Sequence, residues 1–212
     1  ALYTYPESNW CNPYNTGKFL EINKVKTAIL NRGDMHWNLT DARYEVPKGS
    51  GKNAVFASAL WIGGLDDTNS LHLAAMTYRQ TGDDFWPGPL DTITGAIDSA
   101  TSAYYNKIWK VNRYDVEEFK YMFNNGQVQN GNYIIPGDIL TWPAQGIANT
   151  TKYLAPFIDT NNDGNYNPLD GDYPEMKGDQ MLWFVFNDKF SLHGETGGAP
   201  IGLEVQASAY SY

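Results

Sequence analysis

The sequence has one cysteine, few charged residues and no long apolar run. Cys11 is the only cysteine among 212 residues, so neither an internal disulfide nor a zinc site made of cysteines is expected. Only 18% of the residues are charged, against about a quarter in an average soluble domain. No apolar run approaches the roughly 20 residues that a membrane-spanning helix needs, so no membrane span is predicted.

The charge that is present is mainly negative. The chain has 24 acidic and 15 basic residues, a net charge of -9 and a pI of about 4.7. Nucleic acids and anionic membrane surfaces are bound through basic surfaces, so neither is an expected partner. Much of the remaining polarity comes from aromatic residues, with 15 Tyr and 7 Trp, which suits a weakly charged surface made for contact.

Apolar runs separated by turn residues predict a β-rich chain. One strand is expected at Ile22–Leu30, and residues 54–62 and 71–78 are expected to form a hairpin of two largely buried strands at the centre of the core. Two more strands are expected at residues 181–186 and 202–210, the second alternating apolar and polar side chains. Helix-like spacing appears only between residues 92 and 125, where Asn112 is an N-cap candidate and Gly126 a stop signal.

These elements predict a single α+β domain over residues 1–212. Its core is expected to be an antiparallel β-sandwich, with an extended amino-terminal arm at residues 1–20 and a helical insertion at about 92–125.

The strongest chemical motif is a calcium loop at residues 159–172. In a twelve-residue loop that begins at Asp159, oxygen-bearing side chains occur at alternate positions, and Gly164 stands at position 6, where the backbone must turn sharply. Alternate oxygens of a tight loop can converge on one calcium ion, which binds six to eight oxygens. The predicted ligands are Asp159, Asn161, Asp163, Asn165 through its backbone carbonyl, Asn167 and Asp170.

The loop departs from the EF-hand pattern in two ways. Position 12 is Asp170 instead of the longer glutamate, and residues 153–158 before the loop read as extended chain and not as a helix. A single loop of this kind suits a site that stabilises the fold better than a switch. The alternative is a loop whose acidic residues only cap backbone amides.

Other motifs give weaker signals. His193 with Glu195 and Asp188 is a candidate metal or acid/base site, or a histidine that closes a turn by hydrogen bonding. No set of nucleophile, acid and base can be assembled, so the sequence predicts no enzyme. Trp86 and Trp142 stand beside prolines in turn segments and are the exposed candidates for glycan contact. Trp61 and Trp183 are expected in the core or in subunit contacts.

Seven segments have a familiar sequence: Ala42–Gly51, Ala59–Gly64, Ala75–Gln80, Phe85–Leu90, Asp159–Pro174, Gly178–Gln180 and Glu195–Glu204. They resemble the amino-terminal region of large secreted surface proteins of Bacteroidota, which typically carry a type IX secretion signal at the carboxy terminus. The similarity covers most of the chain from about residue 25.

This resemblance implies export and an extracellular or cell-surface location. It also marks Thr92 and Ser99, each preceded by Asp and followed by an apolar residue, as candidate O-glycosylation sites. Two functions are expected on these grounds. The first is a calcium-stabilised structural protein that associates with itself or with other surface proteins in a filament, sheath or layer. The alternative is a glycan-binding adhesin module of a larger secreted protein.

Overall fold

The computed structural model describes residues 16–147 and 149–212, and it confirms a β-rich α+β fold with 13% helix and 30% strand. All strand pairings are antiparallel. The elements are β1 (Gly17–Leu20), β2 (Lys26–Leu30), β3 (Asp34–Met35), β4 (Tyr44–Glu45), β5 (Ser58–Ala59), β6 (Trp61–Leu65), β7 (Leu71–Ala75), β8 (Trp86–Pro87), α1 (Ser99–Tyr105), β9 (Trp109–Asn112), α2 (Arg113–Asn124), α3 (Gly137–Leu140), β10 (Phe157–Ile158), a 3-10 turn η1 (Pro168–Asp170), β11 (Tyr173–Pro174), β12 (Gln180–Asn187) and β13 (Glu204–Ser211).

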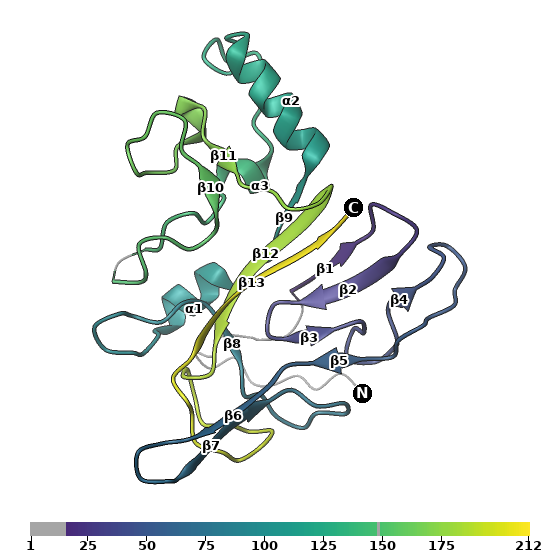
Figure 1. Cartoon of the computed structure of the whole chain (residues 1–212), viewed down its shortest axis with the longest axis vertical. Helices are drawn as coiled ribbons and strands as arrows, with labels where there is room; N and C mark the ends of the chain where they lie inside the picture. Colours follow the sequence, from purple (N-terminus) through teal and green to yellow (C-terminus); the bar gives the residue numbers. More distant parts are fainter. Residues whose placement is uncertain (1–15, 148) are drawn as a thin grey trace.

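Strand β12 is the centre of the molecule, and all eight of its residues are buried. It pairs with β13 along one edge and with β8 and β9 along the other. A strand covered on both faces needs apolar side chains at every position instead of at alternate ones, which explains the continuous run Met181–Phe186. Figure 1 shows β12 running diagonally through the middle of the chain.

Each face of β12 packs into a different part of the core, because successive side chains of a strand point to opposite faces. Leu182, Phe184 and Phe186 join Leu20 and Ile29 of the amino-terminal sheet. On the other face, Met181, Trp183 and Val185 pack with residues of the segment between α1 and β11, among them Trp109, Phe119, Ile139 and Trp142. The strand is therefore held between two layers.

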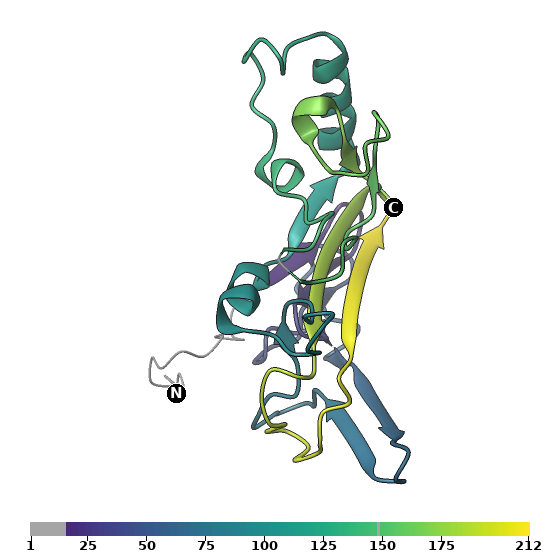
Figure 2. The same ribbon diagram turned by 90° about the vertical axis from the view of Figure 1, so that its left-hand side faces the viewer.

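The predicted hairpin exists, but it does not lie at the centre of the core. Strands β6 and β7 form a hairpin, but Trp61, Leu65 and Leu71 are 70%, 65% and 62% exposed. Figures 1 and 2 show the hairpin projecting from the lower end of the molecule. It lies at the margin because β12, with both faces covered, occupies the centre that the hairpin was expected to fill.

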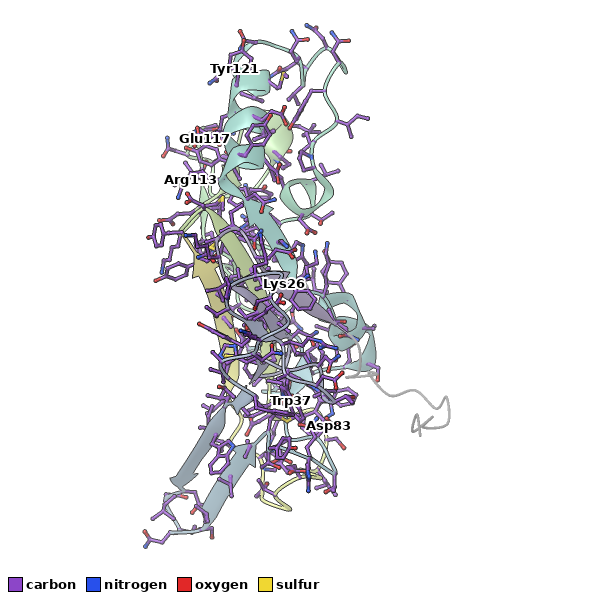
Figure 3. The ribbon with its side chains drawn as sticks, turned by 90° about the vertical axis from the view of Figure 1, so that its right-hand side faces the viewer. Lys26, Trp37, Asp83, Arg113, Glu117 and Tyr121 are labelled. Atoms are coloured by element: carbon purple, nitrogen blue, oxygen red, sulfur yellow. The ribbon has the colours of Figure 1, made fainter. Side chains whose placement is uncertain are left out.

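The helical insertion contains a strand that the sequence pattern did not indicate. Helices α1 and α2 lie within residues 92–125 as expected, but β9 separates them and pairs with β12. Asn112 is the N-cap residue of α2, and the chain turns at Gly126 with a positive φ of 72°. Figure 3 shows Arg113, Glu117 and Tyr121 along this helix, at the end opposite the hairpin.

The predicted amino-terminal arm at residues 1–20 is wrong for its last four residues. Residues 17–20 form β1, which pairs with β2, so they belong to the sheet and not to an arm. Cys11 and the rest of residues 1–15 lie outside the described residues. None of the helices in the described ranges is long and apolar enough to cross a membrane.

Candidate functional site

The predicted calcium loop is held at its base by a short pair of strands. β10 ends at Ile158 and β11 begins at Tyr173, and the two strands pair so that Ile158 lies opposite Tyr173. The strand pair brings the two ends of the loop together, and residues 159–172 form a closed turn at the surface.

The first turn of the loop directs three predicted ligands inward. Asp159 accepts hydrogen bonds from the backbone amides of Asp163 (3.3 Å) and Gly164 (2.8 Å). Asn161 accepts from the amide of Asp163 (3.1 Å), and Asp163 accepts from the amide of Asn165 (2.7 Å). Because every acceptor serves an amide two to five residues ahead, these side-chain oxygens lie on the inner side of one turn.

These hydrogen bonds do not use all the lone pairs of the acceptor oxygens. An ionised carboxylate has about four lone-pair sites, so a carboxylate that accepts one or two amides can still bind a cation. Positive φ angles at Asn162 (60°) and Gly164 (77°) produce the tight reversal that the turn requires. The oxygens of Asp159, Asn161 and Asp163 therefore keep lone pairs that the backbone amides of the turn do not use.

The second half of the loop is arranged differently. Asp170 lies in η1, where its carboxylate accepts from the side-chain amide of Asn167 at 2.6 Å. The side-chain oxygen of Asn167 accepts from the backbone amide of Leu169. Across residues 16–147 and 149–212, no three side chains of His, Cys, Asp or Glu are placed to hold a metal ion together, so Asp159, Asp163 and Asp170 do not converge as they stand.

The residue that closes the loop is Asp172, which the motif did not include. Asp172 is fully buried, and its two oxygens accept from the backbone amides of Thr160 (2.8 Å) and Asn167 (2.9 Å), one from each half of the loop. Gly171 turns the chain back with a φ of 98°, and a Cβ there would lie 2.6 Å from the Phe123 ring. The succession Asp170-Gly171-Asp172 is the sequence signal that could have identified this residue.

Tyr166 anchors the loop to the core. Its hydroxyl donates to the carbonyl oxygen of Ile139 at 2.6 Å, and its ring lies 5.5 Å from that of Phe157. Burial, with the nearby charge of Asp172, raises the pKa of the Tyr166 hydroxyl above its ordinary value. Because Ile139 belongs to the core cluster around Trp109 and Trp183, the loop is mechanically tied to the centre of the molecule.

The proposed glycan contacts, Trp86 and Trp142, are not exposed, and that expectation was wrong. Trp86 is 5% exposed and lies in β8 against β12. Trp142 is 4% exposed, its ring lies 6.4 Å from that of Trp183, and its indole nitrogen donates to the carbonyl oxygen of Pro156. Residues 84–90 and 142–144 are buried together with the two rings. The Trp86 ring lies beside Phe190 and His193, and the Trp142 ring beside Trp183 of β12, where burial is favourable.

The two candidate glycosylation residues are exposed. The hydroxyl of Thr92 donates to the carbonyl oxygen of Asn149 at 2.7 Å. Ser99 is the first residue of α1, and the preceding Asp98 is the N-cap, accepting from the amides of Ala100 and Thr101. Capping explains the aspartate in this motif, and glycosylation stays a prediction.

His193 is a buried turn-closing residue. Its two ring nitrogens lie 2.6 Å from the carbonyl oxygen of Leu73 and 2.7 Å from that of Asp188. Both ring nitrogens are therefore directed at backbone carbonyl oxygens. The Asp84 and Asp188 carboxylates lie 3.8 and 3.9 Å from the ring. This ring has no nitrogen left for a metal, and Glu195 instead accepts from the amides of Thr81 and Gly82.

His72 makes a similar contact beside it. Its ring nitrogens lie 2.6 Å from the carbonyl oxygen of Pro200 and 3.1 Å from the Asp66 carboxylate. The carbonyl of Pro200, and then Asp66, raise the pKa of His72 above its ordinary value. The two histidines thus fasten the segment between β12 and β13 to β7.

Removal of His72 is expected to change how stability depends on pH. A raised pKa means that the folded chain holds the His72 proton more tightly than the unfolded chain does. The contribution of His72 to the free energy of unfolding is therefore complete below about pH 6.5, the pKa of histidine in the unfolded chain. It is lost as the pH rises through the pKa of the folded state. Urea unfolding from about pH 5.5 to 8.5 should show the largest deficit of His72→Gln at the acid end. His36→Gln is the matched control: burial lowers the pKa of His36, so its effect on the pH slope should have the opposite sign. A deficit of His72→Gln that is the same at every pH would contradict this assignment.

Two shallow hollows occur on the surface. One, of about 210 Å³, lies between α2 and β10–β11 and includes Arg113, Glu117 and Tyr173. The other, of about 250 Å³, lies on the hairpin beside Asp66, His72 and Ile201. Both are smaller than the roughly 300–1,000 Å³ of typical small-molecule pockets.

Comparisons with models of protein families, with curated proteins and with solved structures gave no match. The fold itself defines the class: a β-rich α+β protein built around one strand, β12, that is covered on both faces.

Proposed function

We propose that this chain is a non-enzymatic extracellular structural protein, stabilised by calcium, whose copies associate into a filament, sheath or layer at the cell surface. The observation that carries the proposal is the open edge of β13. The sequence resemblance to secreted surface proteins of Bacteroidota supports the location.

Strand β13 is long and has one strand partner in the described part of the chain. All eight of its residues pair with β12 in an unbroken register from Gln180–Ser211 to Asn187–Glu204, without a bulge. Its other edge pairs with none of the described strands. Figures 2 and 3 show β13 along a margin of the molecule. An edge of this length presents unpaired backbone groups to another chain.

The usual protections of an edge strand are missing from β13. It contains neither lysine nor proline, the residues that commonly prevent edge-to-edge pairing. Its one charged residue, Glu204, is engaged by the backbone amide of Leu90 and the side chain of Gln206. The outward side chains are Gln206, Ser208 and Tyr210, which are uncharged and suited to a protein contact.

Size measurement tests this function. In millimolar calcium, purified protein should sediment as species larger than the monomer, and the fraction of these species should rise with protein concentration. Electron microscopy should show regular polymers. A monomer at every concentration, with calcium and without it, would remove the proposal. The glycan-binding alternative is not favoured, because its expected aromatic contacts Trp86 and Trp142 are buried.

Calcium removal should lower the melting temperature. A ligand at about 100 times its dissociation constant stabilises the folded state by about 2.7 kcal/mol, and for a chain of this size each kcal/mol corresponds to about 2–4 °C. We therefore expect melts with calcium and with chelator to differ by about 5–10 °C. Asp163→Asn keeps one acceptor oxygen for the amide of Asn165. In this variant the difference in melting temperature between calcium and chelator should be much smaller. Superimposable melts of the wild-type protein would remove calcium from the proposal.

A further inference from the structure

The hairpin β6–β7 has one face with three large exposed apolar side chains, although Ala75 on that face is buried. Its register places Trp61 opposite Ala75 and Leu65 opposite Leu71, and residues opposite each other share a face. Trp61, Leu65 and Leu71 are 62–70% exposed. The opposite face packs inward, because Ala74 is buried and Ile62 joins the core cluster around Phe186. Large apolar side chains gathered on one exposed face mark a contact surface.

The hairpin is also negatively charged at its tip. Residues 57–78 contain Asp66 and Asp67 and no lysine or arginine. Asp66 is engaged with His72 and with the amides of Thr68 and Ser70, whereas Asp67 is exposed at the tip. Stacking two hairpins face to face would bring like charges together, which is unfavourable. The partner surface should therefore be basic and partly apolar.

The same chain presents such a surface, which we call the lysine patch: exposed Lys24, Lys48 and Lys52, with Ile22 (45% exposed) and Val46 (38% exposed). These residues lie in the turn between β1 and β2 and in the loop after β4. The amide of Lys48 donates to the carbonyl oxygen of Lys24 at 2.7 Å, and the amide of Val46 donates to that of Lys52 at 3.0 Å. The first bond joins the two segments into one surface, and the second closes the loop after β4.

The charge of this region is opposite to that of the rest of the chain. Residues 16–56 hold 7 of the 15 basic residues and only 4 of the 24 acidic ones. Two of those acidic residues interact with nearby groups. Glu21 forms ion pairs with Lys26 and Lys110. Glu45 accepts hydrogen bonds from the backbone amides of Gly49 and Gly51, which lower its pKa. Lys24 and Lys52 make no ion pair with any described residue. The Lys48 ammonium donates to the carbonyl oxygen of Glu21 at 2.6 Å, so Lys24 and Lys52 are the lysines of the patch that can meet an anionic partner.

From this complementarity we infer that the acidic, apolar hairpin of one copy docks on the lysine patch of the next. In Figure 1 the hairpin lies at the lower left and the loops of the patch at the right, so the two surfaces face different ways. A contact between two different patches repeats from copy to copy and produces a ring or an open filament. The inference rests on the proposed self-association and adds a second contact to the one expected at the open edge of β13.

Charge reversal tests the contact by sedimentation. Asp67→Lys alone, or Lys24→Glu with Lys52→Glu, should weaken association by about tenfold or more, because each puts like charges against each other. Mixing the two variants should restore association, since the reversed hairpin of one fits the reversed patch of the other. Combining the three substitutions in one chain should restore it as well.

Two further variants separate charge from apolar contact. Leu71→Ser should weaken association in the wild type and also in the mixture. Glu175→Lys is the matched control, because it makes the same charge change at an exposed residue beside β11, away from both surfaces, and it should associate like the wild type. Thermal melts of all variants should stay close to the wild type because the changed residues are exposed.

The outcomes distinguish this contact from the proposed function. If the wild type associates but the charge-reversed variants associate equally well, the hairpin contact is wrong and self-association stands. If single variants are weakened but their mixture is not restored, the pairing of these two surfaces is wrong. A wild type that stays monomeric overturns both.

Discussion

Replacing Trp183 with alanine is expected to lower the free energy of unfolding by about 3–5 kcal/mol. Trp183 is 1% exposed at the middle of β12, and its ring lies 5.9 Å from that of Trp109 and 6.4 Å from that of Trp142. Removal leaves a cavity under two other large rings, which cannot both move in to fill it. A loss of this size is a large part of the 5–15 kcal/mol that typically stabilises a domain.

Trp61→Ala is the matched control, because it removes the same side chain from the exposed hairpin. Trp61 is 70% exposed and donates one hydrogen bond, to the carbonyl oxygen of Met76 at 2.8 Å. We expect a loss of about 1 kcal/mol. Urea unfolding followed by circular dichroism measures both variants at a concentration where the protein is monomeric. Similar losses for the two would mean that β12 is not the centre of the core.

Replacing Asp172 with alanine is expected to destabilise the loop with or without calcium. Its buried carboxylate accepts from the amides of Thr160 and Asn167 and from the Thr160 hydroxyl at 3.0 Å. Each buried donor left without an acceptor costs about 1–3 kcal/mol. We therefore expect a loss of at least about 2 kcal/mol in chelator, measured by thermal and urea unfolding.

The contrast with Asp170→Ala makes this prediction specific. Asp170 is exposed, and its carboxylate accepts only the side-chain amide of Asn167 among the described contacts. In chelator Asp170→Ala should be close to the wild type, within about 0.5 kcal/mol, while its gain from calcium is reduced. If Asp170→Ala is as damaging as Asp172→Ala in chelator, then Asp172 is not the residue that closes the loop.

Local sequence identified the elements whose pattern is carried by neighbouring residues. The strands β12 and β13 lie where apolar runs and alternation predicted them, and α2 begins after Asn112 as its capping pattern indicated. The loop at 159–172 could be found in the same way, because its oxygen-bearing residues and Gly164 are contiguous in the chain. Residues that act on their near neighbours leave a readable pattern.

Features that depend on distant partners could not be predicted in this way. Strand β9 has four residues and exists because β12 pairs with it. Asp172 acts through Thr160, twelve residues earlier. Trp86 and Trp142 stand in turns that looked exposed, yet both pack beside β12. In each case the deciding contact lies outside the window over which periodicity or turn chemistry can be judged.

By itself the sequence determined the chemical limits of this protein: one cysteine, an acidic balance, a β-rich pattern and a loop with oxygen-bearing side chains at alternate positions. Only the tertiary structure decided which apolar residues are covered. Trp61 and Trp183 are the same residue type in similar apolar runs, and one is 70% exposed while the other is 1% exposed. The physical reason is that burial is decided by which strand is enclosed on both faces, and that place was taken by β12 and not by the hairpin.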